Sequence, residues 1–221
     1  MIYYKDRVFL PIKRKNVEFV HYTVSSANCL TECHTSAMLS ILVVCLLAGS
    51  QLAAGDDSCQ IGTSFTGLDM TKYVGTWYEL FRTPNSDEED FTNCEYDKYT
   101  LDENGVIQVT SVAYTNSTRG FITSTGTVPS WTENTFDIAY GDDETWSSTY
   151  FMVGTDYQTY SIVAGCLDND YSRHLYWIAS HGTSFDDATK AKVNEVLAPY
   201  NLSLDDMEPV DQSYCVQYKS E

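Results

Sequence analysis

The sequence predicts a mainly β protein: an eight-stranded up-and-down antiparallel β-barrel with one C-terminal α-helix packed outside it. Two observations support this prediction. From residue 75 to residue 180, strand-like segments recur at spacings of about 10 to 15 residues, separated by turn-forming residues. After residue 180 the apolar residues follow a helical period, which indicates a single helix after the barrel.

The first expected strand covers residues 75–82, and the series of predicted strands begins with it. Gly75 stands two residues before Trp77. Glycine allows a tight backbone turn, while an indole buries on the order of 200 Å² and needs an acceptor for its N–H. We therefore expect Trp77 to plug one end of the barrel, although Gly-x-Trp also occurs at strand starts by chance.

Seven further strands complete the expected barrel. Their connectors carry turn residues, for example at 102–105 and 141–143. Phe136, Ile138 and Tyr140 alternate along the fifth strand, so these three side chains share one face. The seven strands are expected at 94–101, 106–114, 120–128, 135–140, 149–154, 160–166 and 172–180.

The expected helix covers residues 185–197. Its apolar residues fall at 185, 188, 193, 196 and 197, which is the pattern of an amphipathic helix. Ser184 or Thr183 is the expected N-cap, and Pro199 ends the helix because it cannot continue the backbone hydrogen bonding.

The chain of 221 residues divides into three expected parts. Residues 56–221 form one barrel domain, with enough apolar content for a core. Residues 38–55 read as a secretory signal peptide, because an apolar run from Met38 precedes small residues that a signal peptidase accepts. Residues 1–37 are then a leader or a gene-model extension. The alternative is a type II membrane anchor over residues 37–54, since 18 largely apolar residues are just enough to span.

The charge of the chain is strongly negative, at −18. Residues 1–55 contain five of the basic and three of the acidic side chains, which leaves 8 Lys and Arg against 28 Asp and Glu in the body. Such a body repels phosphate backbones and anionic membranes. We therefore expect no nucleic-acid partner and no stable membrane insertion of the mature chain, while a homo-oligomer is compatible with the sequence.

Cysteines and sequons fit an exported protein. Of seven cysteines, four lie in the body, which predicts two disulfides with three pairings open. No two of the four have the spacing of a zinc or redox site. Asn116 and Asn201 begin two sequons and are expected glycosylation sites. The body cysteines are Cys59, Cys94, Cys166 and Cys215.

The chain resembles the lipocalins, and within them the apolipoprotein D and insect bilin-binding type. Three stretches in order carry the resemblance, which runs from about Cys59 to Cys215. The first is Gly75 to Glu79 around Trp77, the second is the turn that begins with Thr155, Asp156 and Tyr157, and the third is Leu175 to Ser180 with the helix after it.

The resemblance implies a fold, a disulfide pattern and a function. The implied disulfides are Cys59 with Cys166 and Cys94 with Cys215, and the implied function is carriage of a small hydrophobic molecule. One residue departs from the family pattern. Where the family usually stacks an arginine over the motif tryptophan, this chain has His181, and a histidine is expected to make a weaker cation–π contact than an arginine.

The body offers little for catalysis or for binding a metal ion. An enzyme needs a nucleophile with a base, a metal cluster or a tuned carboxylate pair. The body histidines, His174 and His181, are expected on opposite faces of the eighth strand. The acidic runs 87–90 and 142–144 lack calcium-loop spacing and read as solvated loops. We expect no catalytic residues, no metal site and no required cofactor.

The expected ligand lies inside the barrel near its open end. Phe136, Ile138 and Tyr140 form the clearest inward face, and Phe81 shares the parity of Trp77 along its strand. Phe151 is included because the resemblance places a ligand-contacting aromatic there. Tyr114 and Trp177 are assigned by strand parity alone.

Three functions are weighed. The first is a secreted, extracellular carrier of a tetrapyrrole, sterol, fatty acid or carotenoid, any of which the barrel could hold as a bound lipid or pigment. The second is an interaction or structural module whose barrel is filled by side chains. The third is an enzyme on the lipocalin fold, for which the sequence supplies no reactive group. The first hypothesis is preferred.

Overall fold

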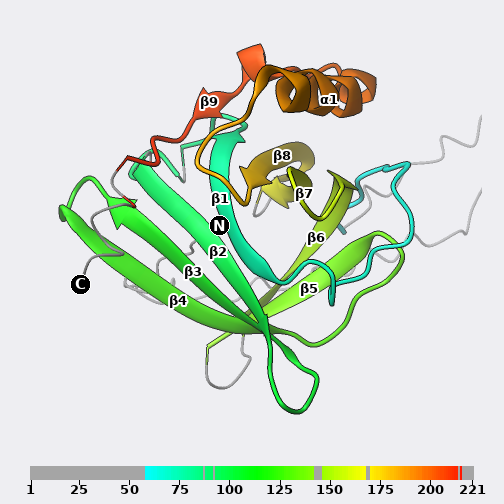
Figure 1. Ribbon diagram of the computed structural model, residues 1–221, viewed down its shortest axis with the longest axis vertical. Coiled ribbons are helices and arrows are strands. Elements are labelled where there is room, and N and C mark those ends of the chain that lie inside the picture. Colours follow the sequence, from blue (N-terminus) through cyan, green and yellow to red (C-terminus); the bar gives the residue numbers. More distant parts are fainter. Residues whose placement is uncertain are drawn as a thin grey trace, which may run out of the picture. The chain divides into compact units, whose positions relative to one another are not determined.

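The computed structural model describes residues 58–213, apart from 87, 92, 142–145 and 168–169, and also residue 215. The predicted leader (1–37) and signal peptide (38–55) lie outside the described residues. Within the described part, eight antiparallel strands close into a barrel, with a short ninth strand and one α-helix after them (Figure 1). The predicted fold class is confirmed.

All eight predicted strands are present, and their bounds differ from expectation by at most three residues. The largest difference is in β6, which begins at Trp146 rather than at 149. The strands are β1 (Gly75–Arg82), β2 (Asn93–Leu101), β3 (Ile107–Thr115), β4 (Gly120–Val128), β5 (Thr135–Tyr140), β6 (Trp146–Thr155), β7 (Ser161–Leu167), β8 (Asp170–Ser180) and β9 (Glu208–Pro209).

The barrel closes because β1 pairs with β8 on one side and with β2 on the other. From β2 to β8 each strand pairs with its neighbour in sequence, as in an up-and-down barrel, and the short β9 pairs with β1. A β-bulge interrupts the β1–β8 pairing: Glu79 faces Ala179, but Phe81 faces Ile178, so β1 has one extra residue between them. Beyond the bulge, the alternation of inward-facing and outward-facing side chains along β1 is therefore reversed.

The helix lies outside the barrel, as predicted. It is α1 (Asp187–Leu197), and the short 3₁₀ turn η1 (Ala198–Tyr200), which contains Pro199, follows it directly. The predicted N-caps, Ser184 and Thr183, were wrong. Asp186 caps the helix instead, because its carboxylate accepts the Thr189 N–H at 2.7 Å. A second 3₁₀ turn, η2 (Leu204–Asp206), leads to β9.

Two apolar clusters lie on opposite sides of the barrel wall. The inner cluster contains Trp77, Phe136 and Trp177, together with residues of the arm that precedes β1. The outer cluster contains Val193 and Leu197 of α1 packed against outward-facing residues of β6, β7 and β8. Residues of the inner cluster line a cavity, and the outer cluster holds the helix in place.

Candidate functional site

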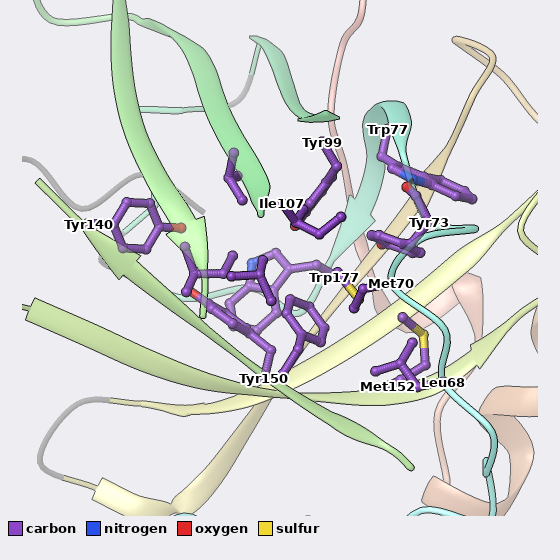
Figure 2. Close-up of a cluster of buried hydrophobic side chains, with 14 of the residues drawn as sticks. Leu68, Met70, Tyr73, Trp77, Tyr99, Ile107, Tyr140, Tyr150, Met152 and Trp177 are labelled. Carbon is purple, nitrogen blue, oxygen red and sulfur yellow. Dashed lines mark hydrogen bonds between the residues drawn. The ribbon is translucent and has the colours of Figure 1, made fainter. Parts of the chain in front are cut away.

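One end of the barrel is closed by a stack of three rings around Trp77. The Trp77 indole lies on the Tyr73 ring, with centroids 4.8 Å apart, and its Nε1 donates to the Tyr73 carbonyl at 2.8 Å. His181 covers the indole at a centroid distance of 3.8 Å. Figure 2 shows Tyr73 beside Trp77, with Met70 close to them. Trp77 is 2% exposed, so the predicted plug is confirmed.

Local geometry explains why Gly75 precedes this stack. Gly75 has a φ of +133°, and a Cβ added there would lie 2.7 Å from Cε1 of His181. Any other residue would be strained and would collide with the ring. The His181 Nδ1 lies 2.7 Å from the Thr76 carbonyl, and because a carbonyl only accepts, Nδ1 carries the proton.

The Thr155–Tyr157 turn fastens the arm before β1 across this closed end. The Tyr157 hydroxyl accepts the Asp69 N–H at 3.0 Å and donates to the Gly67 carbonyl at 3.2 Å. Asp156 holds the turn, since its carboxylate accepts the backbone N–H of Gln158 and of Thr159. The second family stretch therefore has a structural role at the same end as the first.

A cavity lies inside the barrel above the closed end. The volume of the cavity is about 50 Å³, counting only the positions that the centre of a water-sized sphere can occupy. It extends down to Tyr73 and Trp77, deeper than the predicted position near the open end. Four of the seven predicted ligand-contacting residues line it: Phe136, Ile138, Tyr140 and Trp177. That they contact a ligand stays a prediction.

The other three predicted residues do not line the cavity. Phe81 points outward because the β-bulge reverses the parity of β1, and its ring stacks on Phe185 before the helix. Phe151 is buried on the outer face among residues that contact the helix, since its neighbour Tyr150 takes the inward position. Tyr114 lies on the outer face of β3, edge-on to Phe121.

A buried charged cluster at the far end of β1 was not predicted. Arg82 is fully buried, and its Nη1 lies 2.7 Å from Glu95 Oε2 and 3.3 Å from Glu79 Oε1. Its Nη2 donates to the carbonyls of Glu88 and Phe91. Residue 88 belongs to the acidic run 87–90, which was interpreted as a solvated loop. For Glu88 that interpretation was wrong, since the residue is 5% exposed, while Glu89 is exposed as expected.

The β1–β2 loop is anchored to the barrel through the same glutamate. The Glu88 carboxylate accepts from Trp177 Nε1 at 3.2 Å and from Asn85 Nδ2 at 2.7 Å. The loop thus reaches a side chain that also lines the cavity. We name Arg82, Glu79, Glu88 and Glu95 the buried charge cluster.

Burial perturbs the acids and the base of this cluster. It raises the pKa of Glu79, and the nearby Glu95 charge adds to the rise while Arg82 opposes it. Burial also raises the pKa of Glu95, again against the effect of Arg82. For Arg82, burial alone would lower the pKa, but Glu79, Glu95 and Glu88 more than reverse this, so its pKa is raised. The guanidinium is therefore always charged.

Several residues of the cavity wall, acidic residues and tyrosines other than Tyr140, were not predicted from the sequence. Glu79, Glu95 and Asp97 line the cavity, together with Tyr73, Tyr99 and Tyr150. A signal was available, since Glu79 shares the parity of Trp77 before the bulge, and positions 95, 97 and 99 share one face of β2. The predicted cavity wall was chosen from the large apolar residues, so the acidic residues on the same faces were left out of it.

Both disulfides that the resemblance implied are present. Cys59 is bonded to Cys166 and Cys94 to Cys215. The two sequon asparagines are exposed: Asn116 lies in the β3–β4 turn, and Asn201 follows η1 with a φ of 57°. Their glycosylation stays a prediction.

Among the described residues, no group of three or more His, Cys, Asp and Glu side chains has a geometry that could hold a metal ion. In the same residues, no helix has both the length and the apolar character needed to cross a membrane.

Comparison with known proteins supports the resemblance. Residues 68–212 match the family described as the lipocalin-like domain. The major allergen Per a 4 from cockroaches, known from a crystal structure, is 94% identical in sequence to this chain. The structural match covers 74% of this chain and 100% of that chain, with a TM-score of 0.70. Apolipoprotein D of Cavia porcellus is 25% identical over 188 residues, which are 81% of this chain and 98% of that protein.

A more distant structure shares the fold. The tryptamine complex of the amine binding protein of Rhodnius prolixus is 17% identical, covers 69% of this chain and 85% of that chain, and has a TM-score of 0.56.

Proposed function

The chain belongs to the lipocalin family, and from this premise we propose that it is an exported carrier that binds one small hydrophobic molecule inside its barrel. The observation that carries the proposal is the cavity enclosed by inward-facing aromatic side chains, including Phe136, Tyr140 and Trp177. Concave, mostly apolar sites with a few polar groups are the usual ligand sites of proteins. The distant amine binding protein from Rhodnius prolixus was solved with such a small molecule in complex.

The wall favours binding over catalysis. Its hydroxyls belong mostly to tyrosines, and burial raises the pKa of Tyr99 and of Tyr150. Such phenols stay protonated at neutral pH and serve as hydrogen-bond donors rather than as bases. The cysteines of the body are joined in disulfides, so no thiolate faces the cavity.

Ligand titration tests the carrier function. We expect at least one of biliverdin, cholesterol, a fatty acid, a retinoid and a small aromatic ligand to quench tryptophan fluorescence with a Kd below about 100 μM, because burial of ligand surface must outweigh the cost of association. Phe136→Glu should abolish this binding, since the side chain is 1% exposed and lines the cavity. Trp131→Glu, at a position 39% exposed, is the control.

A buried glutamate can also prevent folding, so Phe136→Leu is measured beside it. This variant keeps an apolar side chain and removes the ring. Weaker binding with an unchanged circular dichroism spectrum supports the carrier. Should no ligand bind the parent below about 100 μM, the filled-barrel module is the better account.

Export has its own test. When the full chain is expressed in eukaryotic cells, we expect the protein in the medium with its N-terminus near residue 56, because residues 38–55 read as a signal peptide. N-terminal sequencing measures the cleavage. A full-length protein retained in the membrane fraction would instead support the type II anchor.

A further inference from the structure

One polar group of the cavity wall has no hydrogen-bond partner. Tyr99 of β2 lines the cavity and is only 4% exposed. Within the part of the chain that the structure describes, no residue forms a hydrogen bond with its hydroxyl. A buried polar group without a hydrogen bond costs free energy, so most such groups in folded proteins are paired. An unpaired hydroxyl at a cavity therefore indicates a place where a ligand supplies the partner.

Other hydroxyls of the wall are already engaged. The Tyr73 hydroxyl lies 2.7 Å from that of Ser161, and the Tyr140 hydroxyl is hydrogen-bonded to Tyr150. Each of these groups would have to give up a hydrogen bond within the protein in order to bind a ligand. Tyr99 would gain one, so binding a polar ligand group is most favourable there.

The ring that carries this hydroxyl is held in place. Tyr99 lies edge-on to Tyr73, with centroids 5.0 Å apart, and Tyr73 is in turn stacked on Trp77. The backbone of Tyr99 is paired on both sides, with Gly75 of β1 and Val109 of β3. Figure 2 shows Tyr99 extending into the inner cluster. Because the ring is fixed before a ligand arrives, little conformational entropy is lost when its hydroxyl forms a hydrogen bond.

The Tyr99 phenol acts as a donor. Burial raises the pKa of Tyr99 well above its usual value, and the Asp97 charge adds to the rise, so the group is protonated at neutral pH. The lone pairs of a phenol oxygen are partly delocalised into the ring, and a phenol therefore donates a hydrogen bond better than it accepts one. The ligand group that suits it is an acceptor.

That acceptor is neutral. An ionised group loses its water when it enters a cavity, and this costs far more free energy than one hydrogen bond returns. Tyr99 offers a single O–H. A carbonyl group loses less on leaving water, and its oxygen is satisfied by one or two donors.

The remaining wall fits a small, flat, apolar body. The ring of Phe136 is stacked on that of Tyr150, with centroids 5.4 Å apart, and Tyr150 is edge-on to Trp177. Aromatic side chains of this kind pack against flat apolar groups. One water needs about 10–15 Å³ measured in the same way, so a cavity of about 50 Å³ is nearest in size to a ligand with one or two rings. A tetrapyrrole or a sterol would require the wall to move.

Resting on the carrier function, we propose that Tyr99 determines specificity, and that the ligand is a small, neutral, flat apolar molecule whose carbonyl group accepts a hydrogen bond from the Tyr99 hydroxyl. The cavity defines the site, and Tyr99 defines its polar contact. The same hydroxyl acts against a purely apolar ligand, because such a ligand would bury it without a partner.

Two ligands of nearly the same shape test the proposal. Acetophenone has a carbonyl oxygen where isopropenylbenzene has a methylene group, and both are neutral. Each is titrated by isothermal calorimetry into the parent and into Tyr99→Phe, which removes one oxygen and none of the hydrogen bonds among the described residues. Comparing the effect of the substitution on each ligand cancels the difference in hydrophobicity between the two ligands.

The two ligands should respond to Tyr99→Phe in different ways. We expect the affinity for acetophenone to fall at least about fivefold, because the buried carbonyl loses its donor. The affinity for isopropenylbenzene should stay the same or rise, because the parent buries the Tyr99 hydroxyl against it unpaired. Unchanged affinity for acetophenone, or an equal loss for both ligands, would overturn the proposal.

The infrared band of the bound ketone gives an independent measurement. A hydrogen bond weakens the C=O bond, so the stretching band of acetophenone labelled at its carbonyl carbon should lie at lower wavenumber in the parent than in Tyr99→Phe. A change that affected only the packing of the barrel would not shift this band. Bands at the same wavenumber in both proteins would contradict the assignment of Tyr99 as the donor.

The matched control is Tyr176→Phe. Tyr176 of β8 is buried to a similar degree, at 5% exposed, but it belongs to the outer cluster, where its ring contacts Tyr200, and it does not line the cavity. Its affinities for both ligands should match those of the parent. A loss of acetophenone affinity as large as that of Tyr99→Phe would show that the effect is not local to the cavity and would overturn the proposal.

The outcomes separate this inference from the carrier function. Binding of a retinoid or a fatty acid, with no loss of acetophenone affinity in Tyr99→Phe or no acetophenone binding at all, leaves the carrier function standing and rejects the role of Tyr99. Failure of every ligand to bind rejects both. A loss in Tyr99→Phe that is specific to the ketone supports both.

Discussion

At the end of the barrel that Trp77 closes, three rings stack. The Trp77 indole and the His181 imidazole each donate to a backbone carbonyl, and the Tyr73 hydroxyl is hydrogen-bonded to that of Ser161. Where β1 ends, the fully buried Arg82 guanidinium instead forms ion pairs with four carboxylates, those of Glu79, Glu88, Glu95 and Glu208. The two sites are five residues apart along one strand, roughly 16 Å. One strand thus supports two kinds of interior.

The difference matters for stability. Aromatic stacking gains free energy from apolar burial and is nearly independent of pH. A buried ion cluster must first recover the cost of removing its charges from water, so its contribution to stability depends on complete pairing. We therefore infer that the closed end stabilises the barrel at any pH, while the contribution of the charged end changes with pH.

The largest expected effect is at the closed end. Trp77→Ala should lower the free energy of unfolding by roughly 3–5 kcal/mol, as truncations of large buried aromatics do. Urea denaturation followed by circular dichroism measures it. Trp131→Ala, at an exposed position, should change stability by no more than about 0.5 kcal/mol. A loss below about 1 kcal/mol for Trp77→Ala would mean that the stack does not stabilise the barrel.

A somewhat smaller effect is expected at the charged end. Arg82→Met keeps an apolar stem but leaves Glu79 and Glu95 without their cation, so we expect a loss of about 3 kcal/mol at pH 8. The loss should shrink at pH 5, because protonation removes the uncompensated charges. Arg173→Met, at an exposed position, is the control. A loss that is the same at both pH values would contradict an electrostatic origin.

The pH dependence of the parent protein distinguishes the two ends directly. Glu79 and Glu95 have a raised pKa in the folded state, so their contribution to stability is greatest below the unfolded value of about 4.3 and declines as the pH rises through the folded pKa. The groups that face them are Arg82, Glu88 and Asp97.

Surface aspartates act in the opposite direction. Hydrogen bonds from the N–H groups of Val106 and Thr189 lower the pKa of Asp102 and Asp186, so their contribution to stability is lost as the pH falls below about 3.9.

Because the pKa of Glu79 and Glu95 is raised, we expect a higher melting temperature at pH 5 than at pH 8. The double variant Glu79→Gln, Glu95→Gln should reduce that difference, and an unchanged difference would assign it to other groups.

The two ends of β1 also differ in how well the sequence predicted them. The closed end was predictable because Gly75, Trp77 and Tyr157 stand in the order of the family motifs, and the resemblance placed His181 over the indole, where the structure has it. The fold followed from alternation and turns, which are local properties.

The charged end was not predictable in the same way. Strand parity placed Phe81 inside, but the bulge after Glu79 leaves no mark in the sequence and brings Arg82 inward in its place. A run of acids such as 87–90 is usually solvated, and only the tertiary structure shows that Glu88 reaches Trp177. Composition also cannot reveal how much of a barrel its side chains fill.

The smallest expected effect tests whether His181 is part of the stack or only lies beside it. The imidazole donates to the Thr76 carbonyl and contacts the Trp77 ring, and each interaction stabilises by about 0.5–1.5 kcal/mol at most. His181→Leu keeps an apolar group against the indole and loses the hydrogen bond, so we expect a loss of about 1 kcal/mol. His174→Leu is the matched control, since His174 lies on β8, which ends one residue before His181, and is paired there with Cys166. Denaturation midpoints of both variants measure the difference. If His181→Leu costs no more than His174→Leu, Trp77 and Tyr73 close the barrel without the histidine, and the substitution of His for the usual family arginine has no consequence for stability.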